Sequence, residues 1–396
     1  VAGPGAVDIG VRGWNNTGIE EIDARGTTGT VRLLDTGDSN VIDLRTTRVV
    51  GTNVVIDASY GNDTVFGSAA ADTIVAGQGN DVLDGGGGGD LYRVTGNEAG
   101  GWSSFHNFDT YADTGTSGVD RIVASGLGNV DIGFAGSFGP ASGIEEIDGT
   151  GAKGTKRNGG EGENALLDFR TVKLIGANLV IDGNYGDDTI FGSAAADTIV
   201  GAGGNDVLNG GEGGDTYRVT GNEPGGWGSF HGFDSYADTG TTGTDRILAL
   251  GTGAVDIGLL GSFGPASGIE EINGTGAKGV VRLYGDGSGT TLDFRTVKLV
   301  GTNLVIDASS GNDVVYGSAE ANTLVGGSGD DTLDGAGGAD TYRVTGSIPS
   351  AFQGYDAYAD SGTGGPDKIV AIGTGDVDIG LKGNFGPASG IEAIDA

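Results

Sequence analysis

The stretch "AGQGNDVLDGGGGGDLYRV" (residues 76–94) combines two features that normally oppose folding, a high glycine content and unpaired acidic side chains. Glycine loses more conformational entropy on folding than any other residue. Only a few side chains here, such as Leu83 and Tyr92, are apolar enough for a core. Asp81 and Asp90 lie nine residues apart, each six places into a glycine-rich segment. This spacing predicts a repeated loop in which the carboxylates have a common role.

The composition of the whole chain favours all-β structure. Of its 396 residues, 85 are glycine and only 7 are proline. Glycine is costly inside helices, which excludes a helical bundle. Clusters such as "NVVID" (53–57) and "NLVID" (178–182) are β-branched and strand-like, which argues against disorder. We therefore expect an ordered all-β chain with many turns.

The formal net charge is −33, from 54 acidic and 21 basic residues. Such a surface repels nucleic acid and anionic lipid, so we expect neither nucleic-acid binding nor membrane insertion. The acids either solubilise the surface or supply oxygen ligands to hard cations. The chain has no cysteine, which excludes disulfides and zinc–thiolate sites. No long apolar segment or signal peptide is visible, and without an initial methionine we expect a processed or longer chain.

Internal repetition organises the chain. The segment "GIEEID" (18–23) returns at 143–148, as "GIEEIN" at 268–273 and as "GIEAID" at 390–395, in steps of 125, 125 and 122 residues. We predict three tandem units of about 125 residues at 18–142, 143–267 and 268–389, with partial units at 1–17 and 390–396.

Each unit contains a cassette of four nonapeptides, at 58–93, 183–218 and 308–343. Position 6 is Asp in eleven of the twelve nonapeptides, the exception being Asn322, and position 8 is always Val, Ile, Leu or Tyr. Positions 7–9 predict a short strand with position 8 pointing inward, because strand side chains alternate. Positions 1–6 must reverse the chain, which glycine permits. Stacked loops of this kind offer carbonyl and carboxylate oxygens in the number that Ca²⁺ prefers, whereas Mg²⁺ demands a compact octahedron.

These nonapeptides resemble the hemolysin-type calcium-binding (RTX, repeats-in-toxin) family, whose signature is G-G-x-G-x-D-x-U-x with U apolar. The acidic "D-x-Y-A-D-x-G" stretch and the "I-E-E-I-[DN]-G-T-G" strand outside the cassettes are similar to segments of large bacterial RTX surface proteins. The resemblance implies a right-handed parallel β-roll or β-solenoid with two nonapeptides per coil. It implies Ca²⁺ between loops of successive coils on the same side, type I secretion and folding at extracellular calcium.

The candidate calcium-binding residues are the acids at position 6 and the glycines at position 4. They are Gly61, Asp63, Asp72, Gly79, Asp81, Gly88, Asp90, Gly186, Asp188, Asp197, Gly204, Asp206, Gly213, Asp215, Gly311, Asp313, Gly329, Asp331, Gly338 and Asp340. Loop 2 of each cassette has Ala70, Ala195 or Glu320 at position 4, and these residues resist a positive φ. We therefore expect one to two ions per unit. The ion between loops 1 and 3 is the stronger candidate, and the ion between loops 2 and 4 is the weaker, above all beside Asn322.

The segments 167–182 and 292–307 each predict two strands that lead into a cassette. The absence of visible linkers favours a continuous solenoid over a separate globular domain in each unit.

We expect no enzyme activity. His106 and His231 occupy matching places and Gln353 stands there in the third unit, but no HExxH or G-x-S-x-G motif is present. Trp14, Trp102 and Trp227 are candidate sugar-stacking platforms, although packing beside glycine is the simpler role.

The sequence favours a secreted, calcium-stabilised solenoid with a structural role at a bacterial surface, in an S-layer, matrix, fibre or adhesin. One alternative is an accessory calcium module of a larger secreted enzyme of the epimerase or lipase type. Another is an adhesin that binds surface glycans. Because "VDIG" precedes both the first and the last "GIE" segment, we also predict head-to-tail self-association into filaments or a lattice.

Overall fold

The computed structural model describes residues 2–3, 5–11, 18–95, 107–162, 164–221, 232–345, 353–373 and 376–395. The chain divides into two compact units, Val1–Asp197 and Thr198–Ala396. The regular elements described are short parallel strands and three 3₁₀ turns, η1 (Pro140–Ser142), η2 (Pro265–Ser267) and η3 (Pro387–Ser389). This confirms the predicted all-β, parallel β-roll fold. None of the described residues belongs to a helix with the length and apolarity needed to cross a bilayer.

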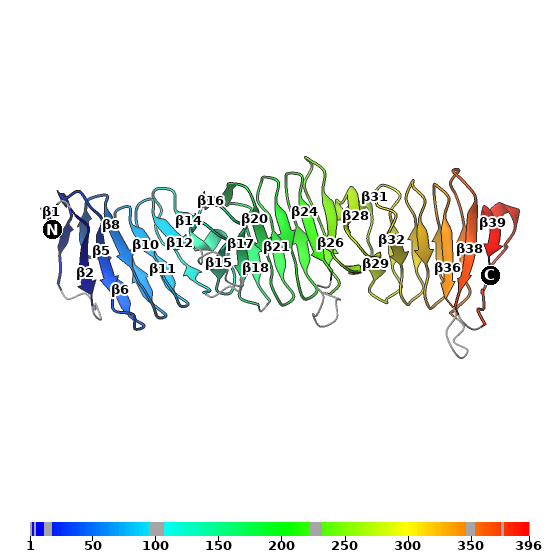
Figure 1. Ribbon diagram of the computed structural model, residues 1–396, viewed down its shortest axis with the longest axis horizontal. Coiled ribbons are helices and arrows are strands. Elements are labelled where there is room, and N and C mark those ends of the chain that lie inside the picture. Colours follow the sequence, from blue (N-terminus) through cyan, green and yellow to red (C-terminus); the bar gives the residue numbers. More distant parts are fainter. Residues whose placement is uncertain are drawn as a thin grey trace. The chain divides into compact units, whose positions relative to one another are not determined.

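In the first unit the strands follow one another as the rungs of parallel ladders (Figure 1). The largest ladder contains β19 (Lys173–Ile175), β16 (Glu146–Ala152), β14 (Arg121–Gly126), β12 (Leu91–Thr95), β10 (Thr73–Val75), β8 (Val54–Asp57), β5 (Val31–Asp35) and β2 (Val7–Val11). A second contains β13 (Thr110–Tyr111), β11 (Val82–Asp84), β9 (Thr64–Phe66) and β6 (Val41–Asp43). The other pairings join β15 (Val130–Phe134), β17 (Lys156–Gly160) and β20 (Leu179–Asp182); β18 (Leu166–Asp168) and β21 (Thr189–Phe191); β3 (Glu21–Asp23) and β7 (Arg48–Val50); β1 (Ala2–Gly3) and β4 (Gly26–Thr27).

The second unit repeats this plan. One ladder contains β22 (Thr198–Val200), β24 (Thr216–Thr220), β26 (Arg246–Gly251), β28 (Glu271–Ala277) and β31 (Lys298–Val300). Another contains β27 (Val255–Leu259), β29 (Val281–Gly285), β32 (Leu304–Asp307), β34 (Thr323–Val325), β36 (Thr341–Thr345), β38 (Asp367–Ile372) and β39 (Ile391–Asp395). A third contains β30 (Thr291–Asp293), β33 (Val314–Tyr316), β35 (Thr332–Asp334) and β37 (Ala357–Ala359), and β23 (Val207–Asn209) pairs with β25 (Ser235–Tyr236).

In the first cassette the chain alternates between two ladders. Strand β9 pairs with β11, and β10 pairs with β12, each in parallel register. Hydrogen bonds between the loops join residues 18 apart, so one coil contains two nonapeptides. The inward direction of position 8 is also confirmed, because those side chains are at most 2% exposed in all three cassettes. They are Val65, Ile74, Leu83, Tyr92, Ile190, Ile199, Leu208, Tyr217, Val315, Leu324, Leu333 and Tyr342.

The segment that leads into the second cassette has three strands, β18, β19 and β20, so the prediction of two strands was wrong. A tight turn closed by a hydrogen bond from Val172 N to Phe169 O (2.9 Å) divides the first predicted strand. Arg170 fixes this turn by pairing with Asp168 at 2.6 Å. A second turn at Gly176 has a φ of 114°. A coil before a cassette therefore contains three short strands, whereas a coil within a cassette contains two.

One core position of the first unit holds a polar side chain. Asn158 in β17 has no exposed surface, and neither its amide nitrogen nor its amide oxygen has a hydrogen-bond partner. The matching positions in the other repeats are Leu33 and Leu283, which are also buried. A buried amide without partners loses its hydration and gains no hydrogen bond in exchange.

We predict that Asn158→Leu stabilises the chain by about 1–3 kcal/mol, the usual cost of a buried polar group without a partner. The measurement is chemical unfolding in saturating calcium. The reciprocal change, Leu283→Asn, serves as the control and is expected to destabilise the chain. A less stable Asn158→Leu variant would contradict this account of the β17 core position.

Candidate calcium sites

The loops of the first cassette stack on two sides of the roll. Loops 1 and 3 form the odd side, where Gly61 N donates to Gln78 O and Gln78 N donates to Ser59 O, both at 2.9 Å. Loops 2 and 4 form the even side, where Gly87 N donates to Ser68 O at 3.0 Å. These bonds hold the loops of successive coils one above the other.

Glycine at position 4 permits this close stacking. All nine position-4 glycines in loops 1, 3 and 4 have φ between 112° and 134°, a range that side chains resist. A Cβ added to Gly79 would lie only 1.7 Å from the carbonyl oxygen of Gly61. None of Ala70, Ala195 and Glu320 has a positive φ, so loop 2 follows a different path.

The position-6 carboxylates form a hydrogen-bonded ladder along each side. On the odd side of the first cassette, Asp63 N donates to Asp81 Oδ1 at 2.7 Å. On the even side, Asp72 N donates to Asp90 Oδ1, also at 2.7 Å. The third cassette repeats both bonds, from Asp313 N to Asp331 Oδ1 (2.9 Å) and from Asn322 N to Asp340 Oδ1 (2.7 Å). One oxygen of each accepting carboxylate therefore caps the backbone of the preceding coil.

In the first and third cassettes, the second carboxylate oxygen of position 6 in loops 1, 3 and 4 is buried and accepts no hydrogen bond. This holds for Oδ2 of Asp63, Asp81, Asp90, Asp313, Asp331 and Asp340. These six residues are at most 1% exposed. Burying an anionic oxygen without a partner is expensive, so each position requires a compensating cation. Carboxylate and carbonyl oxygens are the ligands of hard cations, and the residues present therefore fit calcium.

Loop 2 satisfies its position-6 side chain internally. Asp72 Oδ2 accepts a hydrogen bond from Ser68 N at 2.6 Å, and Asp197 Oδ2 accepts one from Ser193 N at the same distance. In the third cassette Asn322 Oδ1 accepts from Ser318 N at 2.6 Å, so a neutral side chain makes the same bond. The serine N–H thus binds the side-chain oxygen whose counterpart in Asp81 and Asp90 has no hydrogen-bond partner. This is a physical reason for loops 2 and 4 to be the weaker pair.

Burial changes the protonation of the ladder acids. It raises the pKa of Asp81 to about 6, and the nearby charge of Asp63 adds to the effect. Burial likewise raises the pKa of Asp331 to about 6 and those of Asp90 and Asp340 to about 7. Without cations, ionisation of these groups at neutral pH opposes folding.

The ladder extends beyond the residues assigned from the sequence. Asp81 N donates to Asp109 Oδ1 at 3.0 Å, and Asp90 N donates to Asp120 Oδ1 at 2.7 Å. Asp120 N in turn donates to Glu145 Oε2 at 2.7 Å. Each added acid stands two residues before a buried apolar side chain, as position 6 does before position 8. That pattern was the signal that could have identified them.

The second cassette contributes loops 1 and 2 to the first unit and loops 3 and 4 to the second. Ala165 N donates to Asp188 Oδ1 at 2.7 Å in the first unit, and Asp206 N donates to Asp234 Oδ1 at 3.1 Å in the second. The Gln353 carbonyl accepts a bond from Gly329 N at 2.6 Å. The candidate residues Trp14, Trp102, Trp227, His106 and His231 lie outside the described residues.

Comparison with protein families matches the model of the RTX calcium-binding nonapeptide repeat, which comprises four copies, to residues 57–92, 182–217 and 307–342. The chain therefore contains three segments of RTX calcium-binding nonapeptide repeats. Each matched segment begins one residue before a cassette as defined from the sequence. RTX repeats bind calcium, and proteins that carry them are typically secreted. A search of curated proteins gave no match.

We predict that Asp81→Asn lowers calcium affinity more than Asp72→Asn does. Asparagine keeps the oxygen that accepts the backbone bond but replaces the oxygen that has no partner in Asp81. We expect a loss of at least about tenfold, which is usual even for residues that only support a metal ligand. Asp72→Asn reproduces the bond that Asn322 already makes, so its effect should be small. Calcium titration by calorimetry measures both, and equal losses would contradict the difference between the loops.

We predict an inverted pH dependence in calcium-free buffer. The raised pKa values of Asp81, Asp90, Asp331 and Asp340 add stability below about pH 4, and this stability is lost as the pH rises through 6 and 7. The β signal in circular dichroism should therefore grow from about pH 8 to about pH 5. In saturating calcium the trend should reverse, because ligand carboxylates must be ionised. A calcium-free β signal that falls with acidification would refute this role of the ladder acids.

Proposed function

We propose that this chain is secreted by a bacterium, folds on calcium binding outside the cell and has a structural role at the cell surface. The observation that carries the proposal is the set of buried carboxylate oxygens without hydrogen-bond partners in loops 1, 3 and 4 of the first and third cassettes. These oxygens raise the free energy of the folded chain when no cation is bound, and a bound cation would offset that cost.

Coupling between calcium and folding follows from the energetics of the loops. Glycine-rich loops lose much conformational entropy on folding, and the ladder places like charges near one another. An ion that binds only the folded chain adds its binding free energy to folding. Calcium sites of extracellular modules are tuned to concentrations of about 10⁻⁴–10⁻³ M. A chain of this kind stays unfolded at cytosolic calcium and folds after export.

The arrangement of the described residues supports the structural role. They form repeated parallel ladders whose interior is filled by the position-8 side chains and by aromatic contacts such as Phe134 with Phe138 (4.1 Å between ring centres). Our proposal includes no catalytic activity. An accessory module of a secreted enzyme and a glycan-binding adhesin share the calcium chemistry, but no specific contact of the described residues favours either role.

We predict that the chain is largely unfolded in excess EDTA and gains β structure when calcium is added. The measurement is far-ultraviolet circular dichroism at neutral pH, followed as calcium is titrated to millimolar concentration. Magnesium at the same concentration is the control, and it should restore much less structure because its small octahedral shell fits these loops poorly. A β signal that is unchanged by EDTA would overturn the proposed calcium-dependent folding.

A further inference from the structure

Each of the three sequence repeats contains a degenerate fifth nonapeptide that follows the cassette after an insertion. Residues 115–123, "GTSGVDRIV", have glycine at positions 1 and 4, aspartate at position 6 and an apolar residue at position 8. The segments "GTTGTDRIL" (240–248) and "GTGGPDKIV" (362–370) repeat the pattern. The position-4 glycines Gly118 and Gly243 have φ of 105° and 98°, as in the cassette loops. The family match ends before these segments, at residues 92, 217 and 342.

The fifth loop of the first repeat stacks directly on loop 4. A Cβ added to Gly115 would lie 1.7 Å from the carbonyl oxygen of Gly86, and one on Gly118 would lie 2.1 Å from that of Gly88. The strand that follows, β14, pairs in parallel with β12. The fifth nonapeptide therefore adds one more coil on the even side of the roll.

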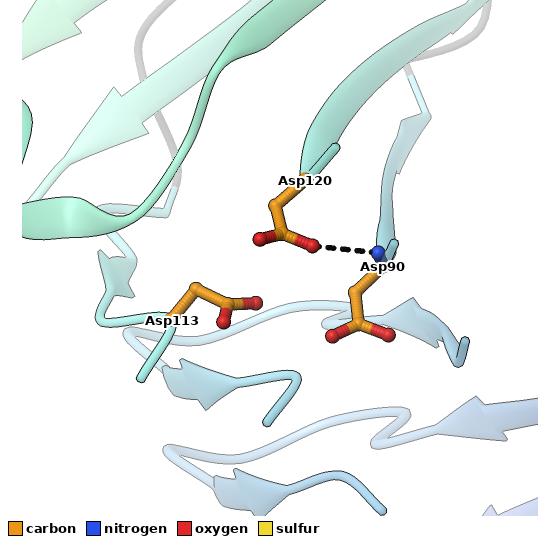
Figure 2. A group of neighbouring side chains, drawn as sticks. All are labelled: Asp90, Asp113 and Asp120. Atoms are coloured by element: carbon orange, nitrogen blue, oxygen red, sulfur yellow. Dashed lines mark hydrogen bonds between the residues drawn. The ribbon is translucent and has the colours of Figure 1, made fainter. Parts of the chain in front are cut away.

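Three carboxylates meet where this coil covers loop 4 (Figure 2). Asp90 belongs to loop 4, Asp120 is position 6 of the fifth nonapeptide, and Asp113 lies just before it. One carboxylate oxygen from each lies within 4.8 Å of the other two, and all three residues are buried. Figure 2 shows Asp113 and Asp120 directing their carboxylates to the same space beside Asp90. Asp90 is 1% exposed, and its Oδ2 accepts no hydrogen bond.

Tyr92 holds the third carboxylate in place. Its hydroxyl donates to Asp113 Oδ2 at 2.6 Å and accepts a bond from Gly85 N at 2.7 Å. Gly115 N donates to Asp113 Oδ1 at 2.8 Å. Asp113 is thus fixed beside two other buried acids, Asp90 and Asp120. Such an arrangement of acids is stable at neutral pH only when a cation balances it.

We propose that Asp90, Asp113 and Asp120 form a calcium site that joins the end of the cassette to the fifth nonapeptide. This inference rests on the proposed calcium-dependent folding and adds a site outside the four matched nonapeptides. On the even side, Ser68 satisfies Asp72, so the first acid with an oxygen available to a cation is Asp90. The even-side ion therefore lies one coil beyond the place that the four-nonapeptide pattern gives it.

The repeats differ at this position. In the second repeat Asp215, Asp238 and Asp245 make the same close group, and the Tyr217 hydroxyl donates to Asp238 Oδ2 at 2.5 Å. In the third repeat the equivalent acids are Asp340, Asp360 and Asp367, which do not form such a group among the described residues. There the Tyr342 hydroxyl donates to the Ala359 carbonyl instead, at 2.6 Å. The inference therefore assigns one such site to each of the first two repeats.

The test compares Asp113→Asn with its counterpart Asp360→Asn in the full chain. Native mass spectrometry in calcium should find one ion fewer in Asp113→Asn than in the wild type and an unchanged number in Asp360→Asn. The amide oxygen of asparagine can still accept the hydrogen bond from the Tyr92 hydroxyl. If Asp113 had only a structural role, the ion count would therefore be unchanged. Asp113→Asn should also unfold at a lower temperature than the wild type in calcium, whereas Asp360→Asn should not. An unchanged ion count in Asp113→Asn overturns the inference.

A measurement on the wild type keeps the test decisive if Asp113→Asn does not fold. A crystal grown in calcium and soaked with terbium should give an anomalous peak among the three carboxylates. A calcium- and terbium-bound roll without that peak overturns the inference but leaves the proposed function intact. A wild-type chain that binds no calcium, or folds fully without it, overturns the proposed function itself.

Discussion

The fold depends on the carboxylate at position 6 of the nonapeptides, because its two oxygens have different roles. At position 6 of loops 1, 3 and 4 in the first and third cassettes, Oδ1 accepts the backbone N–H of the preceding coil, and Oδ2 stays buried without a hydrogen-bond partner, as in Asp81. The first bond aligns successive coils. The second oxygen makes that alignment costly unless a cation is present. Coil stacking and cation binding therefore depend on the same side chain, and neither can be optimised without the other.

The extreme glycine content follows from this constraint. For a carboxylate to reach the amide of the preceding coil, the loops must approach until their backbones touch. The carbonyl oxygen of Gly61 lies where a Cβ of Gly79 would be, and Gly86 bears the same relation to Gly115. Glycine lowers the intrinsic stability of such loops through its conformational entropy. Cation binding offsets that loss in the folded state alone, which makes the chain's folding conditional on its surroundings.

The sequence predicted the features that depend on local periodicity. The nine-residue period and strand alternation were sufficient to place Leu83 and Tyr92 in the core and the position-6 acids on the loops. Loop 2 was identified as different because Ala70 resists a positive φ, but the structure adds the larger reason, the bond from Ser68 N to Asp72. Side-chain hydrogen bonds of this kind depend on the exact loop path, which no spacing rule supplies.

The features that the sequence did not predict are those that depend on an interruption of the period. An insertion separates Asp120 from the cassette, so the acid fell outside the nonapeptide register although it is hydrogen-bonded to Asp90 N. The role of Asp113 depends on the Tyr92 hydroxyl, which sequence alone assigns to the core. Asn158 shows the converse, since its strand keeps the expected pattern while its side chain lacks any partner. Periodicity thus determines where a side chain points but not what it meets there.

The difference between loop 2 and the other loops has a consequence for the whole roll. If both ions of a cassette lay between its own two coils, they would clamp the same pair of coils twice. With Asp72 satisfied by Ser68, an ion on the odd side would join the first coil to the second, and the proposed even-side ion at Asp90 would join the second to the third. Staggered in this way, two ions would hold three successive coils. The cassette would thereby be tied to the non-repetitive coil that follows it, and calcium binding would extend order beyond the nonapeptides that supply most of its ligands.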